Sequence, residues 1–237
     1  ENSKFNYYGN IKWNGNFNYN SNNVQNNSEK YYTGYNVKVG IIDGGFNGDY
    51  YDDLYREVKN ITRIYSSRIS NDKDYHGYAV ASLIAGKEGI APDADMYVID
   101  GTDDEDDDKL TITSDLYQKL YDRGVRIFNN SFGVEYETYS DKKDDFYKND
   151  VSENTLDFYK TAVASGSLFV FAAGNEEYNT SLLRATLPYW VPELEEGWIN
   201  VNGLTSKTQE QKGNFNFNNF KPFAGAAGAK NWTVTTI

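Results

Sequence analysis

Short runs of consecutive apolar residues recur along the chain, and most of them end in glycine, asparagine or another turn residue. A continuous run of this kind, rich in β-branched residues and bounded by turn residues, is typical of a strand buried on both faces of a sheet. The pattern predicts strands within residues 37–45 (VKVGIIDGG), 96–99, 125–133 (VRIFNNSFG), 168–172, 197–204 and 231–237.

Segments with apolar residues at helical spacing lie between these strands. Residues 74–86 (DYHGYAVASLIAG) predict a buried helix that begins near His76, with an apolar face formed by Ala79, Val80, Leu83 and Ile84. A second helix is predicted within 111–124, and a third from Ser152, a candidate N-cap. Strands that alternate with helices in this way indicate an α/β fold with a mostly parallel central sheet covered on both faces.

The length and composition of the chain suit one large domain. It has 237 residues, of which 39% are hydrophobic, so a sizeable core can form. Residues 1–32 are rich in asparagine and tyrosine and have little apolar periodicity, so they predict a loosely ordered arm on the surface. The domain itself is therefore placed at residues 33–237.

Charge and composition argue against several classes of function. A formal net charge of -12 argues against binding to a nucleic-acid backbone, and no apolar run is long enough to span a membrane. The absence of cysteine excludes disulfides, thiolate catalysis and cysteine-ligated zinc. Residues 103–108 are all acidic but lack the ligand spacing of a calcium loop. They indicate a solvated loop, with opportunistic cation binding as the alternative.

Four polar side chains stand where the predicted elements begin or end. Asp43, Ser131 and Asn175 follow apolar strands, and His76 is the only histidine in the chain. In a parallel sheet, ligands bind at the carboxyl ends of the strands. An aspartate, a histidine and a side-chain amide are what acyl transfer by a serine requires besides the serine itself. A structural histidine and an aspartate that merely caps the next segment are the alternatives at this point.

The motifs around these residues resemble those of the subtilisin-like serine proteases, the subtilases. The matching segments are VGIIDGG, HGYAVASLIAG, NNSFG and VFAAGN, in the family's order and between Val39 and Asn175. The resemblance implies a three-layer subtilisin-like fold. A later segment, TLPYWVPELEEGWINVNGL, is similar to the passenger domains of bacterial autotransporter proteases. That narrower resemblance implies secretion or surface display by a Gram-negative bacterium.

The resemblance also assigns roles to individual residues. Asp43 and His76 would be two of the three members of a catalytic triad, and Asn175 would donate from its side-chain amide to the oxyanion. The backbone of Ser131, Phe132 and Gly133 would pair with a peptide or protein substrate as an added strand and wall the pocket for its P1 side chain. No cofactor is required, although calcium is found in many members of the family.

The sequence departs from the family pattern at three places. Gly44 stands where the family usually has serine or threonine, and Tyr78-Ala79 stands where it usually has threonine and histidine. The nucleophile motif, Gly-Thr-Ser followed by small residues and proline, does not occur, and the contexts of Ser167, Ser181 and Ser206 do not match it.

The missing motif leaves two interpretations of the chain. In the first, the chain is the amino-terminal majority of a serine endopeptidase domain. Its carboxyl-terminal part would be missing through truncation or internal cleavage, and that part could be a separate chain. Such a chain is expected to be inactive alone. In the second, it is a non-catalytic surface or adhesin-like module on a subtilase scaffold.

Overall fold

The fold is taken from a computed structural model, which describes residues 33–46, 57–64, 76–102, 110–133, 150–175, 181–206, 220–222, 229 and 231–236. The predicted arm at 1–32 and the acidic run at 103–108 lie outside these residues. None of the helices described is both long and apolar enough to cross a membrane.

The chain alternates strands with helices, as the apolar pattern predicts. The elements are β1 (Lys38–Asp43), β2 (Ile61–Arg63), α3 (His76–Ala85), β3 (Asp95–Asp100), α4 (Ser114–Tyr121), β4 (Ile127–Asn130), α5 (Glu153–Ala164), β5 (Leu168–Ala172), the 3₁₀ helices η3 (Arg184–Tyr189) and η4 (Pro192–Gly197), β6 (Trp198–Ser206), β7 (Phe220–Pro222) and β8 (Thr233–Thr236). The predicted strands and helices are all present, and the Ser152 hydroxyl caps α5 by accepting from the Thr155 amide. The apolar pattern does not predict β2, β7 or either 3₁₀ helix.

The strands form one sheet in the order β2-β3-β1-β4-β5-β6-β7, and β8 also pairs with β6. Every pairing is parallel except that of β6 with β7, which confirms the mostly parallel sheet. The strand order changes direction at β1, because β3 lies on one side of it and β4 on the other. In open α/β sheets a crevice forms outside the carboxyl ends of the strands at such a point.

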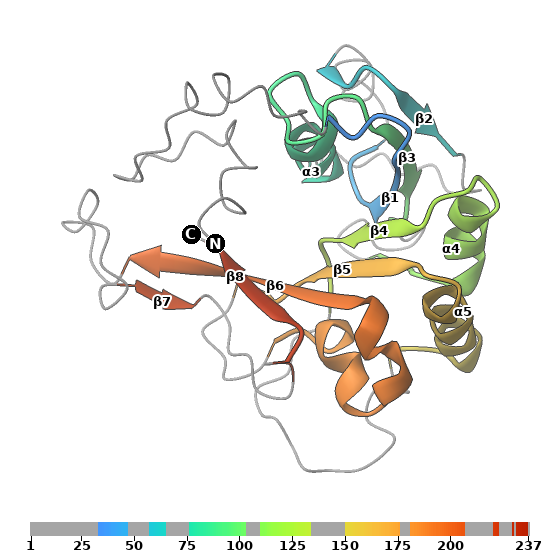
Figure 1. Ribbon diagram of the computed structural model, residues 1–237, viewed down its shortest axis with the longest axis vertical. Coiled ribbons are helices and arrows are strands. Elements are labelled where there is room, and N and C mark those ends of the chain that lie inside the picture. The colour runs from blue at the N-terminus through green and yellow to red at the C-terminus, as the bar shows by residue number, and fades with distance from the viewer. Residues whose placement is uncertain are drawn as a thin grey trace.

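Side chains alternate between the two faces of β1, and each face meets a different helix layer. Val39 and Ile41 belong to the core cluster beneath α3, whereas Ile42 belongs to the cluster that includes α4 and α5. Figure 1 shows α3 on one side of the sheet and α4 and α5 on the other. Asp43 has the same parity as Ile41, so its side chain lies on the α3 face.

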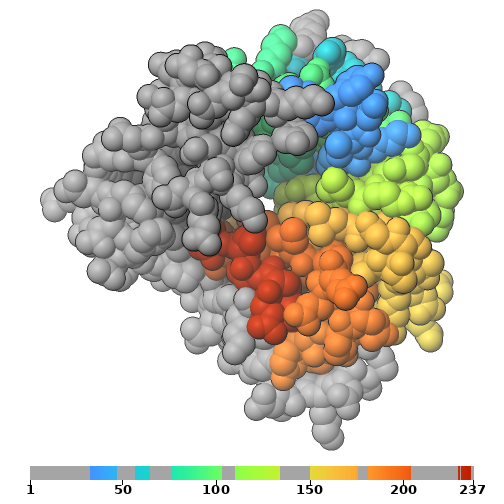
Figure 2. All heavy atoms as spheres, viewed as in Figure 1, coloured from blue at the N-terminus to red at the C-terminus, as the bar shows by residue number. Residues whose placement is uncertain are grey.

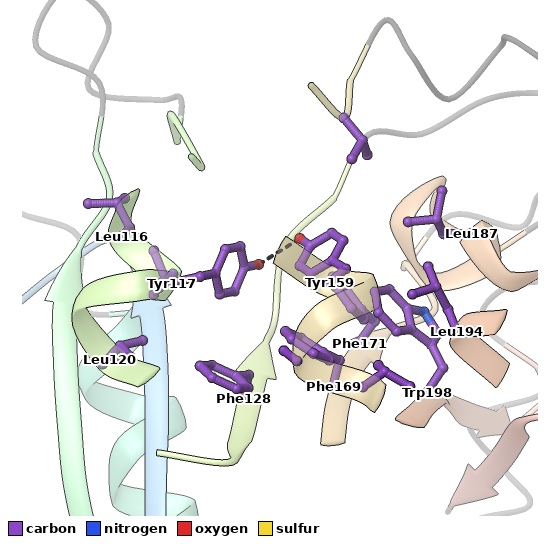
Figure 3. Packing of buried hydrophobic residues seen from close by; sticks show 14 of the residues in the cluster. Leu116, Tyr117, Leu120, Phe128, Tyr159, Phe169, Phe171, Leu187, Leu194 and Trp198 are labelled. Carbon is purple, nitrogen blue, oxygen red and sulfur yellow. Dashed lines mark hydrogen bonds between the residues drawn. The ribbon is translucent and has the colours of Figure 1, made fainter. Parts of the chain in front are cut away.

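The larger core is aromatic and lies between the sheet and the helices α4, α5, η3 and η4. Figure 3 shows the rings of Tyr117, Phe128, Tyr159, Phe169, Phe171 and Trp198 packed against one another. Phe128 stacks on Phe169 with ring centroids 4.7 Å apart, and Phe171 stacks on Trp198 at 4.8 Å. These contacts join the neighbouring strands β4, β5 and β6 on the face that α4 and α5 cover.

A chain of buried hydrogen bonds crosses this aromatic core. The Tyr117 hydroxyl donates to Asn130 Oδ1 at 2.7 Å, and the Tyr159 hydroxyl donates to Tyr117 at 3.0 Å. Arg184 Nη1 donates to the Tyr159 hydroxyl at 3.3 Å, and its Nε donates to Asp150 Oδ2 at 2.8 Å. Burial raises the pKa of both tyrosines, so their hydroxyls stay protonated and remain donors.

The buried face of α3 differs from the one that the apolar spacing predicts. The fully buried positions are Gly77, Ala81 and Ala85, whereas the predicted Leu83 is 71% exposed. Small side chains let the helix approach β1 closely, and the larger Val80 and Ile84 only border the core. The helix is therefore oriented by close backbone contact at its first turn rather than by its largest apolar residues.

Candidate active site

The side chains of Asp43 and His76 meet at the carboxyl end of β1. His76 Nδ1 lies 2.8 Å from Asp43 Oδ1, although the two residues are 33 positions apart in sequence. The Asp43 side chain is 4% exposed and the His76 side chain 50% exposed. A neutral imidazole that donates from Nδ1 to this carboxylate keeps Nε2 as a proton acceptor. The pair therefore combines a buried acid with a base that solvent can reach.

Backbone contacts hold the two halves of this pair together. The Gly44 amide donates to Asp43 Oδ1 at 2.8 Å, and the Gly44 carbonyl accepts from the Gly77 amide at 2.8 Å. Gly45 has a φ of 81°, which glycine adopts without strain and which turns the chain beneath α3. Gly44, one of the departures from the family pattern, thus contributes through its backbone to both sides of the site.

The docking of α3 requires glycine at its second residue, which gives a first prediction. A Cβ at Gly77 would lie 2.4 Å from the Gly44 carbonyl oxygen and 2.7 Å from Cζ of Phe46. Gly77→Ala is therefore expected to lower the free energy of unfolding by about 1–3 kcal/mol, because α3 must move away from β1. Urea titration followed by circular dichroism measures this change.

Leu83→Ala serves as the control for Gly77→Ala, because it removes a larger group from the same helix at an exposed position. We expect its unfolding midpoint to stay close to that of the unchanged chain. A large loss for Leu83→Ala with none for Gly77→Ala would mean that α3 buries the face predicted from the sequence.

The segment Ser131–Gly133 directly follows β4, the strand next to β1. Asn129 Nδ2 donates to Ser131 Oγ at 3.0 Å, and the Phe132 ring lies 6.3 Å from that of Phe171. A Cβ at Gly133 would lie 2.8 Å from Cβ of Leu182, so the backbone passes close to the segment after β5. In Figure 2, residues 110–133 (yellow-green) lie beside the blue surface of residues 33–46.

Asn175 follows β5, the next strand along the sheet, and its side chain is exposed. The residue before it, Gly174, has a φ of 113°, which bends the chain away from the strand direction. Among the predicted site residues, Asp43 and His76 are thus in direct contact. Asn175 and the segment 131–133 lie after the carboxyl ends of β5 and β4, at the same edge of the sheet.

Sequence reasoning missed Asp100, which is paired in register with Asp43 on the adjacent strand β3. Its side chain is 2% exposed, and its carboxylate accepts from the Phe46 amide at 3.1 Å and the Thr102 amide at 3.0 Å. A signal was present, because MYVID resembles VGIID as an apolar strand that ends in aspartate.

The described residues hold no group of three or more histidine, aspartate or glutamate side chains suited to a metal ion. Calcium therefore stays a prediction without assigned ligands. Ser167 and Ser181 are 2% and 1% exposed, and Ser181 Oγ accepts from Asn200 Nδ2 at 2.8 Å. Both serines are thus buried in the fold, where a substrate cannot reach them.

Comparison with known proteins agrees with the motifs. The family model described as Subtilase family matches residues 34–236. The chain is similar to the Neisserial autotransporter lipoprotein NalP of Neisseria meningitidis serogroup B. The protein of strain ATCC BAA-335 / MC58 is 26% identical over 220 residues, and that of strain H44/76 is 25% identical over 219 residues. Each alignment covers 79% of this chain but 20% of the relative, so the chain spans only that share of these proteins.

Two solved proteases are also similar. The Prenylagaramide maturation protease PagA has a TM-score of 0.47 at 21% identity, covering 70% of this chain and 53% of PagA. The psychrophilic subtilisin-like protease Apa1 from the Antarctic psychrotroph Pseudoalteromonas sp. AS-11 has a TM-score of 0.49 at 17% identity, covering 72% of this chain and 37% of Apa1. Because the family model extends over nearly all the residues from the first strand to the last, the chain belongs to the subtilase family.

Proposed function

We propose that this chain carries the acid and the base of a serine endopeptidase site. The observation that supports the proposal is the 2.8 Å contact between His76 Nδ1 and the buried carboxylate of Asp43. The contact lies at the point where the strand order changes direction, which is where an α/β sheet offers a crevice to a ligand.

In this proposal each residue has one role in acyl transfer. His76 takes the proton of a serine hydroxyl as the hydroxyl attacks a peptide carbonyl, and it returns that proton to the leaving amine. Asp43 holds the imidazole in the tautomer in which Nε2 is the acceptor, and it stabilises the imidazolium that forms. The Asn175 amide donates to the oxyanion of the tetrahedral intermediate. The backbone of 131–133 aligns the substrate as an added strand.

The nucleophile is proposed to come from a segment other than these 237 residues, because no Gly-Thr-Ser motif occurs among them. The chain by itself is then expected to hydrolyse no peptide bond through a triad. Its substrates would be peptides or proteins, and a segment that contains the serine would be its first partner.

The location proposed for this activity is outside the cell or on a bacterial cell surface. The support is the similarity to proteins described as autotransporter lipoproteins, at 25–26% identity. A nucleic-acid partner remains disfavoured because the formal net charge is -12.

A fluorophosphonate probe tests the proposed function, because it reacts covalently with a serine that a nearby base activates. We expect the parent protein, meaning these 237 residues together with the proposed serine-bearing segment, to be labelled, and its His76→Gln variant and the 237-residue chain not to be. Labelled protein is detected by mass spectrometry after tryptic digestion.

The control is denatured parent protein, which should not react. If the folded parent protein is not labelled, the endopeptidase proposal is wrong and the non-catalytic surface module becomes the better interpretation. Labelling that persists in His76→Gln would remove His76 from the role of base.

A further inference from the structure

A second carboxylate is buried beside the Asp43–His76 pair. Asp100 is the last residue of β3 and is paired in register with Asp43, the last residue of β1. Parallel neighbours in register project to the same face of a sheet, so both side chains lie on the α3 face. Asp100 is only 2% exposed. Burying a carboxylate costs free energy unless hydrogen bonds replace those it made with water.

The hydrogen bonds of Asp100 hold the turn that follows Asp43. Its Oδ2 accepts from the Phe46 amide at 3.1 Å, and its Oδ1 accepts from the Thr102 amide at 3.0 Å. The neighbouring Gly101 amide donates to the Asp43 carbonyl at 3.0 Å. The carboxylate thus connects the end of β3 to the turn 44–46.

The same turn carries the contacts that dock the first residues of α3. The Gly44 carbonyl accepts from the Gly77 amide, and the Phe46 ring closes the space where a Cβ of Gly77 would lie. Phe46 is fully buried, so it cannot move without disturbing the core beneath α3. Gly77 directly follows His76. Displacement of the turn would therefore displace the imidazole.

We infer that Asp100 is a positioning residue that keeps His76 in contact with Asp43 by anchoring the turn 44–46. This inference rests on the proposed function, because it concerns the geometry of the same acid–base pair. Asp100 acts through the Phe46 amide and the docking of α3, and it takes no proton from substrate or nucleophile.

Asp100→Asn is a sharp test because the variant is isosteric. A carboxylate accepts both amide hydrogens, whereas an asparagine offers one oxygen and turns its NH₂ towards the second amide. One buried donor then loses its acceptor, and the turn shifts to relieve the conflict. Asp95→Asn is the matched control, because it makes the same change in β3 at the opposite end of the strand, away from Asp43.

The readout uses the fact that His76 is the only histidine in the chain. Proton NMR of the 237-residue chain should show one low-field imidazole resonance, from the Nδ1 proton that donates to Asp43. We expect it in the unchanged chain and in Asp95→Asn. In Asp100→Asn we expect it to be lost or to exchange with water at least about tenfold faster.

The outcomes separate this inference from the proposed function. A folded Asp100→Asn chain whose resonance and exchange rate match those of Asp95→Asn would overturn the positioning role. Absence of the resonance in the unchanged chain would mean that Asp43 and His76 do not meet, which would overturn the proposed function and this inference with it.

A measurement on the unchanged chain covers the case in which Asp100→Asn does not fold. If Asp100 anchors the turn, the Phe46 and Gly77 amides open together and exchange with deuterium at rates within about threefold of each other. Fast exchange at Phe46, with Gly77 and the Nδ1 proton of His76 still protected, would show that the turn does not hold the pair.

Discussion

Asp43→Asn is expected to lower kcat of the proposed protease, in which these 237 residues are joined to the serine-bearing segment, by about 10⁴-fold with little change in KM. An asparagine can direct its NH₂ at Nδ1 of His76, and the imidazole then carries its proton on Nε2, where it cannot accept one from a nucleophile. The variant also lacks the negative charge that stabilises the imidazolium. The segment 131–133, which is proposed to align the substrate, follows β4 and not β1, so binding of the peptide should be preserved.

Steady-state hydrolysis of a peptide substrate by the parent protein measures both constants. Asp95→Asn is again the control and should retain the kcat of the unchanged enzyme. A kcat for Asp43→Asn within a few-fold of the unchanged enzyme would mean that another group orients His76, and the assignment of Asp43 would have to be abandoned.

Arg184→Met is expected to cause the largest loss of stability, about 3–5 kcal/mol in the free energy of unfolding. The Arg184 side chain is 5% exposed, and that of its ion-pair partner Asp150 is 18% exposed. Methionine fills a similar volume but leaves the Asp150 carboxylate without its cation. It also removes the donor that Arg184 supplies to the Tyr159 hydroxyl.

Lys160→Met is the matched control for this change. Lys160 pairs with Glu193 at 2.9 Å, but the two side chains are 39% and 58% exposed, so water compensates for the lost pair. Guanidinium titrations should show a clearly lower midpoint for Arg184→Met and an unchanged one for Lys160→Met. Equal midpoints for the two variants would show that the buried network adds nothing to stability beyond a surface pair.

The strands could be predicted from the sequence because a strand that is buried on both faces of a sheet needs a continuous run of apolar residues. The run at 168–172 coincides with β5, for example. β2 was missed because three residues, Ile61–Arg63, are too few to establish a pattern. The 3₁₀ helices were missed because their segment contains Pro188 and Pro192 and has no helical spacing of apolar residues.

The candidate site was only partly predictable. The motifs indicated that Asp43 and His76 belong together, and the structure brings them into contact. The buried face of α3 was predicted only in part: Val80 and Ile84 pack against the core, but Leu83 is exposed, because the backbone contact at Gly77 sets how the helix docks. The sequence marks Asp100 only as an aspartate at the end of an apolar strand. Its contacts and those of Arg184 could not be predicted, since they depend on strand register and on the packing of distant helices.

The central place of β1 in the sheet has a consequence for synthesis. A chain emerges from the ribosome with its amino terminus first. β1 is made before both of its neighbours, β3 and β4. Until residues 127–130 have been added, the strand that carries Asp43 therefore has an unpaired edge of backbone N–H and C=O groups, with the apolar side chains of Val39, Ile41 and Ile42 on its two faces. Such an edge can pair with the strands of other nascent polypeptides. A chaperone that covers this edge would protect the growing chain until β4 has been synthesised.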